Sequence, residues 1–362
     1  MPNGVLPIQT LRKLLQPKII DGIDEKYLNP ASIDLPFSDD DEAYKVESIF
    51  LPLKGETVRS ALELIGAEKH DLSQRLEVGV PYVIKIAGTW NLPDDVYAYA
   101  NPKSSTGRNN AFCRVVADGV PMYDALIGPG WKGELWLLVR PDSFPVLVQP
   151  GLSLAQVRLF YGKSFLDKLE VEIAVKKHGL LFNPSGYVIP NEDVHWHADS
   201  LVLSLYVGEN MGWECRGSRK TIDFSKIRHY DGEEFFEPVR SRNGSIILRK
   251  NTFYILATEE RIMVPPYLSA ELRAIDPRLG EFRSHAAGYI DPGWGWGKEG
   301  EKHGSHITLE VIPFEDTLIR SGQAIARIRY ERMYQEPDVV YDAANSNYTE
   351  QRGATLSKHF KA

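Results

Sequence analysis

The hydrophobic pattern changes character near the start of the chain. Between residues 7 and 15 the apolar side chains recur at helical spacing, at Ile8, Leu11, Leu14 and Leu15. After residue 22 the apolar runs are only a few residues long and are separated by Pro, Gly, Asp and Asn. The pattern therefore predicts one N-terminal helix followed by many short strands.

Runs of strand character recur in both halves of the chain. They are residues 82–86, 134–139 and 155–160 in the first half, and 245–248, 253–257, 306–311 and 326–330 in the second. Many short strands predict a mainly β protein, a sandwich or a barrel, rather than a parallel sheet built from β-α-β units. Residues 164–169 have the pattern of a short connecting helix.

The two halves share landmarks at a nearly constant spacing, which indicates an internal duplication. The matching pairs are Leu92 and Val264, Arg108 and Arg278, Pro129 and Pro292, and Gly151 and Gly322. Their spacings are 172, 170, 163 and 171 residues, so one register holds apart from a local change of length. We therefore expect two tandem β-domains, 1–165 and 166–362, with the seam between Gly162 and Pro184. The second copy adds a glycine- and charge-rich hairpin tip at 295–304.

Length and charge narrow the class of function. The chain has 362 residues, which fits two domains at the usual ~100–200 residues each. Its net charge of −7 argues against a general nucleic-acid binder. No apolar run reaches the ~18–20 residues of a membrane span, and the N-terminus lacks the pattern of a signal peptide. We expect a cytoplasmic protein that acts on a small molecule, with no nucleic-acid or membrane partner.

The metal-binding residues are sparse. Cys113 and Cys215 are the only cysteines, too few for a disulfide framework or a multi-cysteine zinc site. His195-Trp196-His197 places two imidazoles on one side of a strand, but no third ligand is apparent nearby. We therefore expect two reduced thiols and no metal site.

The first half carries a turn rich in hydrogen-bond donors, Lys103-Ser104-Ser105-Thr106-Gly107-Arg108. Hydroxyls, backbone amides around a glycine and a guanidinium suit phosphate oxygens. A solvated surface turn would have the same composition. Taken alone, this segment leaves both interpretations open.

The second half carries other polar motifs at the corresponding places. It has Ile290-Asp291-Pro292-Gly293 and Ile307-Thr308-Leu309-Glu310, where the first half has Ile127-Gly128-Pro129-Gly130 and Leu135-Trp136-Leu137-Leu138. Conversely, its arginine turn at 274–280 keeps Arg278 but has no serine pair. Each half therefore holds an incomplete set, and the two sets complement each other.

In this order the motifs resemble those of the dCTP deaminase and trimeric dUTPase superfamily, in a tandem two-domain form. Residues 11–15 and 29–35 are similar to that family's first helix and strand, and residues 347–353 to its substrate-covering tail. The resemblance implies two dUTPase-like, distorted, jelly-roll-like β-barrels with few short helices. Because the family's active sites lie between neighbouring barrels, it also implies a composite site between the two copies.

The resemblance also implies residue roles. Glu310 would be the general base that activates water for attack at C4 of cytosine, with Ser104 and Arg108 orienting the water or stabilising developing charge. The implied substrate contacts are Lys103 and Ser105 at the triphosphate, Asp291 at the deoxyribose, the Ala287 carbonyl, Thr308, Leu309, and the tail residues Tyr341, Tyr348 and Gln351. Alternation along a strand places Thr308 and Glu310 on one face, which is equally consistent with a solvated glutamate.

The implied reaction is hydrolysis of dCTP to dUTP and ammonia, with Mg²⁺ only as part of the nucleotide complex. Zinc is not expected, because zinc-dependent nucleoside deaminases need a Cys-x-x-Cys that this chain lacks. Two alternatives stay open: a bifunctional enzyme that yields dUMP and pyrophosphate, and a non-catalytic nucleotide-binding protein. Inhibition by dTTP and a homo-oligomer are family features that the sequence leaves undecided.

Some residues depart from the family pattern. Asn347 stands where the tail commonly has a basic residue, and Gly128 stands in place of the aspartate in the first copy. Asp118 and Asp124 flank that altered motif without replacing the aspartate. We therefore expect the first copy to lack its carboxylate, and Arg278 to form a structural ion pair.

Overall fold

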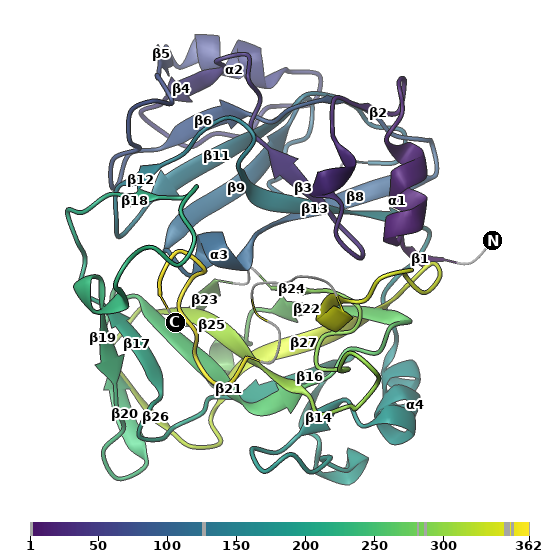
Figure 1. Ribbon diagram of the computed structural model, residues 1–362, viewed down its shortest axis with the longest axis vertical. Helices are drawn as coiled ribbons and strands as arrows, with labels where there is room; N and C mark the ends of the chain where they lie inside the picture. Colours follow the sequence, from purple (N-terminus) through teal and green to yellow (C-terminus); the bar gives the residue numbers. More distant parts are fainter. Residues whose placement is uncertain are drawn as a thin grey trace. The chain divides into compact units, whose positions relative to one another are not determined.

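The structure is a computed structural model, and it describes residues 3–124, 128–280, 282–285, 288–343, 348 and 351–361. The chain forms two compact units (Figure 1). The first unit contains Met1–Lys163, Gly217–Asp231 and Ser357–Ala362, and the second contains Ser164–Arg216 and Gly232–Leu356. Both are built mainly from short strands, which confirms the predicted fold class.

The first unit contains four sheets. One joins β1 (Gly4–Val5), β13 (Ser153–Tyr161), β3 (Ile33–Pro36) and β8 (Val96–Pro102). A second runs in the order β5 (Glu68–Lys69), β4 (Ala43–Lys45), β6 (Tyr82–Lys85), β11 (Leu135–Pro141) and β9 (Ala111–Ala117). Two small sheets join β10 (Lys132–Gly133), β7 (Thr89–Asn91) and β2 (Ile20–Asp21), and β12 (Val146–Leu147) with β18 (Ile222–Asp223).

The second unit has two large sheets and one two-stranded sheet. The first sheet runs β19 (Phe236–Val239), β17 (Gly212–Cys215), β21 (Tyr254–Ile262), β25 (Ser305–Pro313) and β23 (Phe282–His285), with β14 (Leu181–Phe182) paired to β21. The second runs β15 (Trp196–His197), β16 (Ser200–Ser204), β27 (Ala324–Arg332), β22 (Leu268–Arg273) and β24 (Tyr289–Ile290). The two-stranded sheet joins β20 (Ser245–Leu248) and β26 (Thr317–Arg320), which are antiparallel.

The duplication is visible in the strand register. In the first unit β11 lies between β6 and β9, and Leu138 pairs with Val83. In the second unit β25 lies between β21 and β23, and Glu310 pairs with Ile255. Both members of the second pair are offset by 172 residues from the first, the spacing that the sequence landmarks predict. Leu138 therefore stands where the second unit has Glu310.

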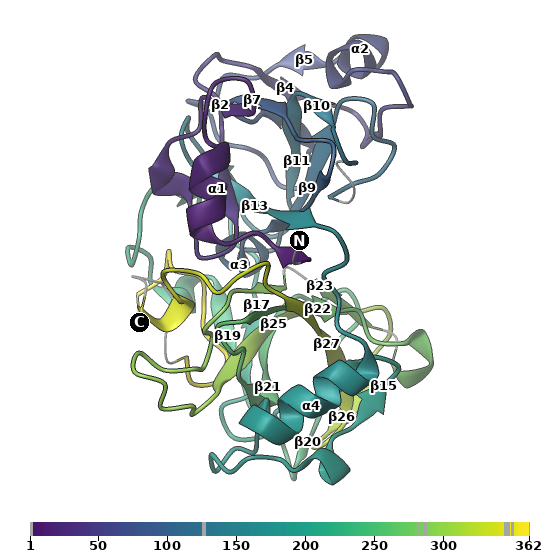
Figure 2. The ribbon, with the colours of Figure 1, turned by 90° about the vertical axis from the view of Figure 1, so that its right-hand side faces the viewer.

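Helices are few and short. The α-helices are α1 (Ile8–Leu14), α2 (Val58–Leu64), α3 (Ser104–Gly107) and α4 (Lys168–His178), and α1 lies beside β13 in Figure 2. The 3₁₀ turns are η1 (Glu25–Tyr27), η2 (Asn191–Asp193), η3 (Gly232–Glu234), η4 (Pro277–Leu279) and η5 (Tyr341–Ala343). Among the described residues, no helix has the length and apolar character needed to cross a membrane.

The connecting helix begins later than the predicted 164–169. Phe165 forms a β-bridge with Glu331, and the Leu166 amide donates to the Tyr330 carbonyl, so this segment is extended. Asp167 then caps α4 by accepting from the Glu170 amide, while the Glu170 side chain accepts from the Asp167 amide. This reciprocal capping fixes the helix start at Lys168.

Two segments of the second sequence half belong to the first unit. Residues 217–231 join it through β18, which pairs in parallel with β12. Residues 357–361 pack against that segment, where Tyr230 bridges Phe360. The single boundary near residue 165 expected from the sequence therefore does not describe these two segments, because their placement depends on pairing with distant strands.

Candidate functional site

In the second unit, strand β25 has one apolar and one polar face. Ile307, Leu309 and Val311 lie in the unit's hydrophobic core. Thr308 and Glu310 alternate with them and therefore point to the opposite face. Glu310 is only 4% exposed and Thr308 only 6%. Glu310 is therefore not a solvated strand residue, and the Leu309 side chain points away from the polar face.

On one side of β25, the residues paired with Glu310 are apolar. Its register partner Ile255 on β21 is completely buried, and Ile255 is in turn paired with Trp213 on β17. Directly paired residues of antiparallel strands share a face, so Glu310 lies in a row with these two apolar residues. On the other side of β25, Glu310 is paired in register with His285 on β23. Placing a carboxylate in such surroundings costs free energy, and such positions are candidates for functional groups.

The C-terminal tail covers this face. Gln351 Nε2 donates to Thr308 Oγ1 at 2.7 Å and to the His306 carbonyl at 3.1 Å. The Thr355 amide donates to the same Thr308 hydroxyl at 3.3 Å. The Trp213 indole donates to the Ala354 carbonyl at 3.3 Å. Residues 351–355 therefore lie along the polar face of β25, at Thr308, which is two positions from Glu310 in the strand.

The beginning of the tail packs on the turn that carries Asp291. The Tyr341 amide donates to the Pro292 carbonyl at 2.8 Å, and the rings of Tyr341 and Trp294 are 5.1 Å apart. Gly293 has a φ of +89°, and a Cβ there would lie 2.5 Å from Val340. Asp291 is 9% exposed, and Tyr348 packs against the hydrophobic core. The turn therefore needs a glycine both for its backbone conformation and for the close approach of the tail.

The first unit holds the Ser-Ser-Thr-Gly-Arg motif in and directly after α3, a single helical turn that follows β8. The Lys103 amide and the Thr106 hydroxyl both donate to the Leu154 carbonyl on β13, at 2.9 and 2.7 Å. The Lys103 ammonium forms an ion pair with Asp34. Arg108 follows the helix and is 3% exposed. These contacts exclude the interpretation of the motif as a solvated surface turn.

A cavity of about 510 Å³ opens beside this turn within the first unit. Its lining includes the basic side chains of Lys26, Lys103 and Lys358, the Ser105 and Thr106 positions, and one acidic group, Asp34. Burial, with the neighbouring Lys103, lowers the pKa of Lys358. Three lysines against one carboxylate make the cavity suited to an anion.

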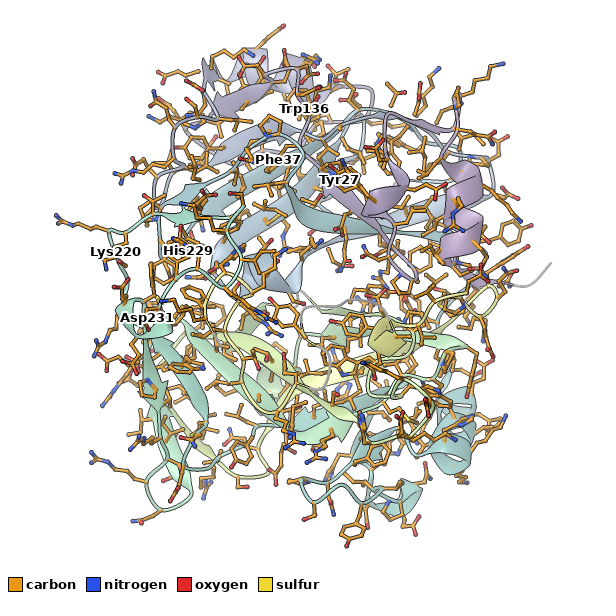
Figure 3. All side chains as sticks on the ribbon, viewed as in Figure 1. Tyr27, Phe37, Trp136, Lys220, His229 and Asp231 are labelled. Atoms are coloured by element: carbon orange, nitrogen blue, oxygen red, sulfur yellow. The ribbon has the colours of Figure 1, made fainter. Side chains whose placement is uncertain are left out.

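The face of the first unit that corresponds to the Glu310 face is filled by a helix. Trp136 and Leu138 on β11 pack with Val58 and Leu62 of α2 in a separate apolar cluster, and Trp136 is labelled in Figure 3. All four side chains are at most 4% exposed. The first copy therefore has no carboxylate at this position and no room for a ligand over its strand.

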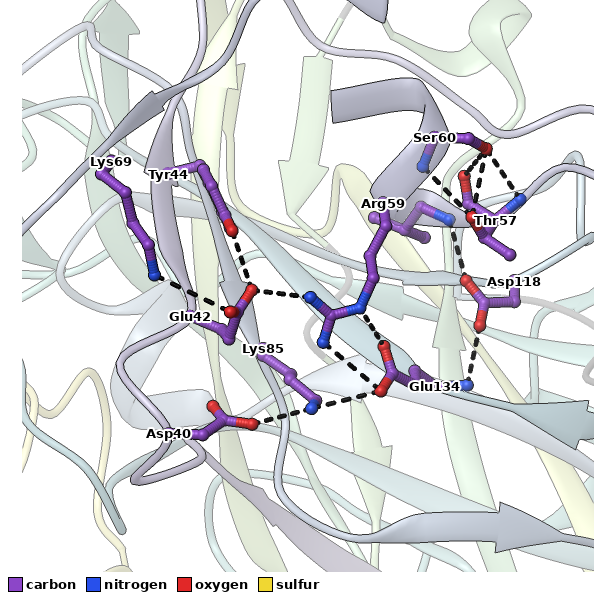
Figure 4. Close-up of polar contacts among 11 residues, drawn as sticks. Asp40, Glu42, Tyr44, Thr57, Arg59, Ser60, Lys69, Lys85, Asp118 and Glu134 are labelled. Carbon is purple, nitrogen blue, oxygen red and sulfur yellow. Dashed lines mark hydrogen bonds and ion pairs between the residues drawn. The ribbon is translucent and has the colours of Figure 1, made fainter. Parts of the chain in front are cut away.

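Polar contacts hold α2 over that face. Asp118 accepts from the Val58 amide at 2.8 Å and from the Glu134 amide at 3.0 Å, which ties the helix start to the strand beneath (Figure 4). Arg59 pairs with Glu42 at 2.9 Å and with Glu134 at 3.0 Å. Asp118 is therefore a structural residue of this filled face.

Asp124 is also engaged in a structural pair. It pairs with Arg114 at 2.8 Å and accepts from the Val115 amide at 2.7 Å. Burial raises the pKa of Asp124 to about 6. Neither aspartate that flanks the altered motif replaces the missing one.

Ion pairs hold together the arginine turn of the second unit, residues 274–280. Arg278 donates twice to Asp276, at 3.0 and 2.7 Å, which holds the pKa of Asp276 well below its usual range. His197 lies 3.2 Å from Asp276 and accepts from Arg327 at 2.7 Å. This is the structural ion pair expected for Arg278, and it also engages one imidazole of His195-Trp196-His197.

The structure groups the predicted site residues by unit. Within the first unit lie Lys103, Ser104, Ser105 and Arg108, and within the second lie Asp291, Thr308, Leu309, Glu310, Tyr341, Tyr348 and Gln351. Ala287 and Asn347 lie outside the described residues. Cys113 and Cys215 are free thiols, and burial raises the pKa of Cys113. Sequence motifs alone did not identify Trp213, which contacts the tail, or Asn109, which contacts the motif turn.

Comparisons with known proteins agree with this division. Models of the N-terminal and C-terminal domains of 2'-deoxycytidine 5'-triphosphate deaminase match residues 2–163 and 183–360. A probable deoxyuridine 5'-triphosphate nucleotidohydrolase of Methanopyrus kandleri is 28% identical over 135 residues, covering 37% of this chain and 79% of that protein. A solved structure, 2'-deoxycytidine 5'-triphosphate deaminase from Agrobacterium tumefaciens, is similar with a TM-score of 0.84 and 33% identity over 93% of this chain and 97% of the other. The chain therefore belongs to the 2'-deoxycytidine 5'-triphosphate deaminase family.

Proposed function

We propose that this protein hydrolyses dCTP to dUTP and ammonia without a catalytic metal, with Glu310 as the general base. The observation that carries the proposal is the burial of Glu310 on the polar face of β25, beside Thr308 and the docked tail. A carboxylate in such a position is suited to accept a proton from a bound water, because little bulk water competes for it.

The chemistry follows from one carboxylate and one water. Glu310 takes a proton from the water while the water oxygen forms a bond to C4 of cytosine. The tetrahedral intermediate then collapses as the bond between C4 and the exocyclic nitrogen breaks. Both protons of the water are used: the one taken by Glu310 is passed to N3 of the ring, and the one left on the new C4 hydroxyl is passed through Glu310 to the exocyclic nitrogen. The nitrogen then leaves as ammonia, and the C4 oxygen becomes the uracil carbonyl. Glu310 is regenerated as a carboxylate.

We propose that Ser104 and Arg108 complete this site by orienting the water and stabilising developing negative charge. Each unit offers what the other lacks, since the first has Leu138 in place of Glu310 and the second has the closed Asp276–Arg278 turn. Within the second unit Thr355 is hydrogen-bonded to the strand of Glu310, and within the first unit Ser357 is hydrogen-bonded to the serine motif.

The proposed substrate contacts are also divided between the two units. Lys103 and Ser105 line the basic cavity and are assigned to the triphosphate, which arrives with its Mg²⁺. Asp291, Thr308, the Ala287 carbonyl and the tail residues Tyr341, Tyr348 and Gln351 are assigned to the sugar, base and closure. The Leu309 side chain lies in the core, so its contact would come from the backbone.

Product analysis tests the proposal. The purified chain is incubated with dCTP and Mg²⁺, and the products are separated by anion-exchange chromatography. We expect dUTP from the unmodified protein and none from Glu310→Gln. Glu260→Gln is the matched control, because Glu260 is a partly buried glutamate of the same unit with a raised pKa, and its carboxylate accepts from the Ser204 amide on another strand. Equal loss of dUTP in both variants would remove the special role of Glu310.

A second function is favoured by one comparison. The Methanopyrus kandleri relative is named as a nucleotidohydrolase of deoxyuridine triphosphate, so phosphoanhydride cleavage after deamination is the alternative. Formation of dUMP and pyrophosphate from dCTP would establish it. Binding of dCTP without any turnover would instead make the protein a non-catalytic nucleotide-binding protein. The same preparation, assayed with added dTTP and by light scattering, decides inhibition and oligomeric state.

A further inference from the structure

The chain ends on the first unit, although the tail before it belongs to the second. Residues 357–361, which we refer to as the C-terminal strap, follow Leu356 without a break. Ser357, His359 and Phe360 are 2%, 1% and 3% exposed. Burial of this degree indicates that these residues are docked on the rest of the unit.

The strap docks on residues 217–231. The amides of Arg228 and His229 donate to the carbonyls of Lys358 and His359, each at 2.9 Å, and the Lys361 amide donates to the Tyr230 carbonyl at 2.8 Å. The His359 ring stacks on Phe224 at 4.6 Å, and its Nδ1 donates to the Lys226 carbonyl at 3.0 Å. His229, labelled in Figure 3, therefore lies on the segment that receives the strap.

The receiving segment is itself attached to the first unit. Its strand β18 pairs with β12, where Ile222 is opposite Val146. The amides of Ile222 and Phe224 donate to the carbonyls of Pro145 and Leu147, at 2.9 and 3.0 Å. Ile222 is completely buried. The strap is thus held by a platform fixed to the unit that carries the serine motif.

Ser357 links this platform to the motif turn. Its hydroxyl donates to the Ser105 carbonyl at 3.0 Å and accepts from Asn109 Nδ2 at 3.0 Å. The same Asn109 amide group donates to the Ser105 carbonyl at 2.7 Å. All three residues are at most 7% exposed. The Ser105 carbonyl is therefore held by two donors, one of which comes from the end of the chain.

We propose that Ser357 is a positioning residue, and that the strap sets the geometry of the Ser104 and Arg108 side chains. The α3 helix has only four residues, too short to hold its own shape. On one side Leu154 fixes it through Lys103 and Thr106. On the other side, the Ser357–Asn109 pair fixes the peptide group between Ser105 and Thr106, inside the segment that separates Ser104 from Arg108.

The consequence for the reaction rests on the proposed deaminase function. A catalytic group displaced by about 1 Å loses roughly a hundredfold in rate, whereas binding of the distant parts of a substrate changes little. Loss of the Ser357 hydroxyl is therefore expected to reduce kcat by about tenfold or more and to change KM by less than about threefold.

The test compares Ser357→Ala with Ser143→Ala in the full chain. Ser143 is the matched control because its hydroxyl accepts from Asn110 at 2.7 Å, next to Asn109, without reaching the Ser105 carbonyl. Turnover of dCTP gives kcat and KM for each variant. Hydrogen exchange of the peptide spanning 104–110, without ligand, reports the order of the turn independently of chemistry. A denaturation curve for each variant shows whether it is folded.

Faster exchange at 104–110 in Ser357→Ala alone, with lower kcat and nearly unchanged KM, is the expected result. Unchanged exchange and unchanged kcat would overturn the proposal, as would equal effects in Ser143→Ala. If the unmodified protein does not turn over dCTP, the proposed function fails. The exchange comparison then decides alone whether the strap orders the motif turn, since it requires no activity.

Discussion

Thr308→Val is predicted to release the tail while keeping the fold of the second unit. Valine has nearly the shape of threonine, so the main change is loss of the hydroxyl that accepts from Gln351 and Thr355. A hydrogen bond contributes about 0.5–1.5 kcal/mol net, and Gln351 keeps its bond to the His306 carbonyl. We therefore expect a loss of about 1–2 kcal/mol in tail docking, or about a tenfold increase in the undocked population.

Hydrogen exchange of residues 351–356 in the ligand-free protein measures this loss without involving substrate contacts of Thr308. Thr258→Val is the control, because Thr258 lies on neighbouring β21, is completely buried and also makes two hydrogen bonds, but does not contact the tail through them. We expect about tenfold faster exchange of the tail in Thr308→Val only. Unchanged exchange, or the same increase in Thr258→Val, would refute the assignment of Thr308 as the tail's anchor.

Two further predictions concern the first unit. Asp118→Ala removes the acceptor of two charge-assisted hydrogen bonds that fix α2, and should lower the free energy of unfolding by about 2–4 kcal/mol in a denaturant titration. It should leave kcat within about twofold, because the face under α2 carries no motif residue; a much larger loss of kcat would contradict the filled face. Burial lowers the pKa of His359 to about 4. In the unfolded chain the histidine becomes protonated as the pH falls through about 6.5, whereas in the folded protein it stays neutral down to about pH 4. The free energy of unfolding should therefore have its full value above about pH 6.5 and should decrease as the pH is lowered towards about 4. Unfolding midpoints should show this slope in the unmodified protein and a shallower one in His359→Phe, and equal slopes would contradict it.

The internal duplication could be predicted from the sequence because its landmarks are local. A Pro-Gly-Trp turn or a strand end keeps its identity without knowledge of its neighbours. The helix α2 also left a signal, since Val58, Ala61 and Leu62 recur at helical spacing after the Thr57 cap. The pattern could not predict what the apolar face of α2 packs against. In the structure it packs against the strand position equivalent to Glu310.

The exchange of segments between the units could not be predicted. The strand β18 has only two residues, and its partner β12 is more than seventy residues away in sequence. Such a pairing leaves no periodic signal in the chain. The burial of Glu310 was ambiguous for the same reason. Alternation predicted that Glu310 shares a face with Thr308, but the tail that covers this face is distant in sequence from the strand.

The most direct test of the central claim is the reaction of dCTP in water enriched in ¹⁸O, with mass spectrometry of the products. Attack of a Glu310-activated water at C4 predicts one ¹⁸O in the uracil base of dUTP and none in its phosphates. Glu310→Gln should form no labelled base, and Glu260→Gln should label it as the unmodified protein does. Label in the phosphates alone, or labelled base from Glu310→Gln at the full rate, would contradict the account.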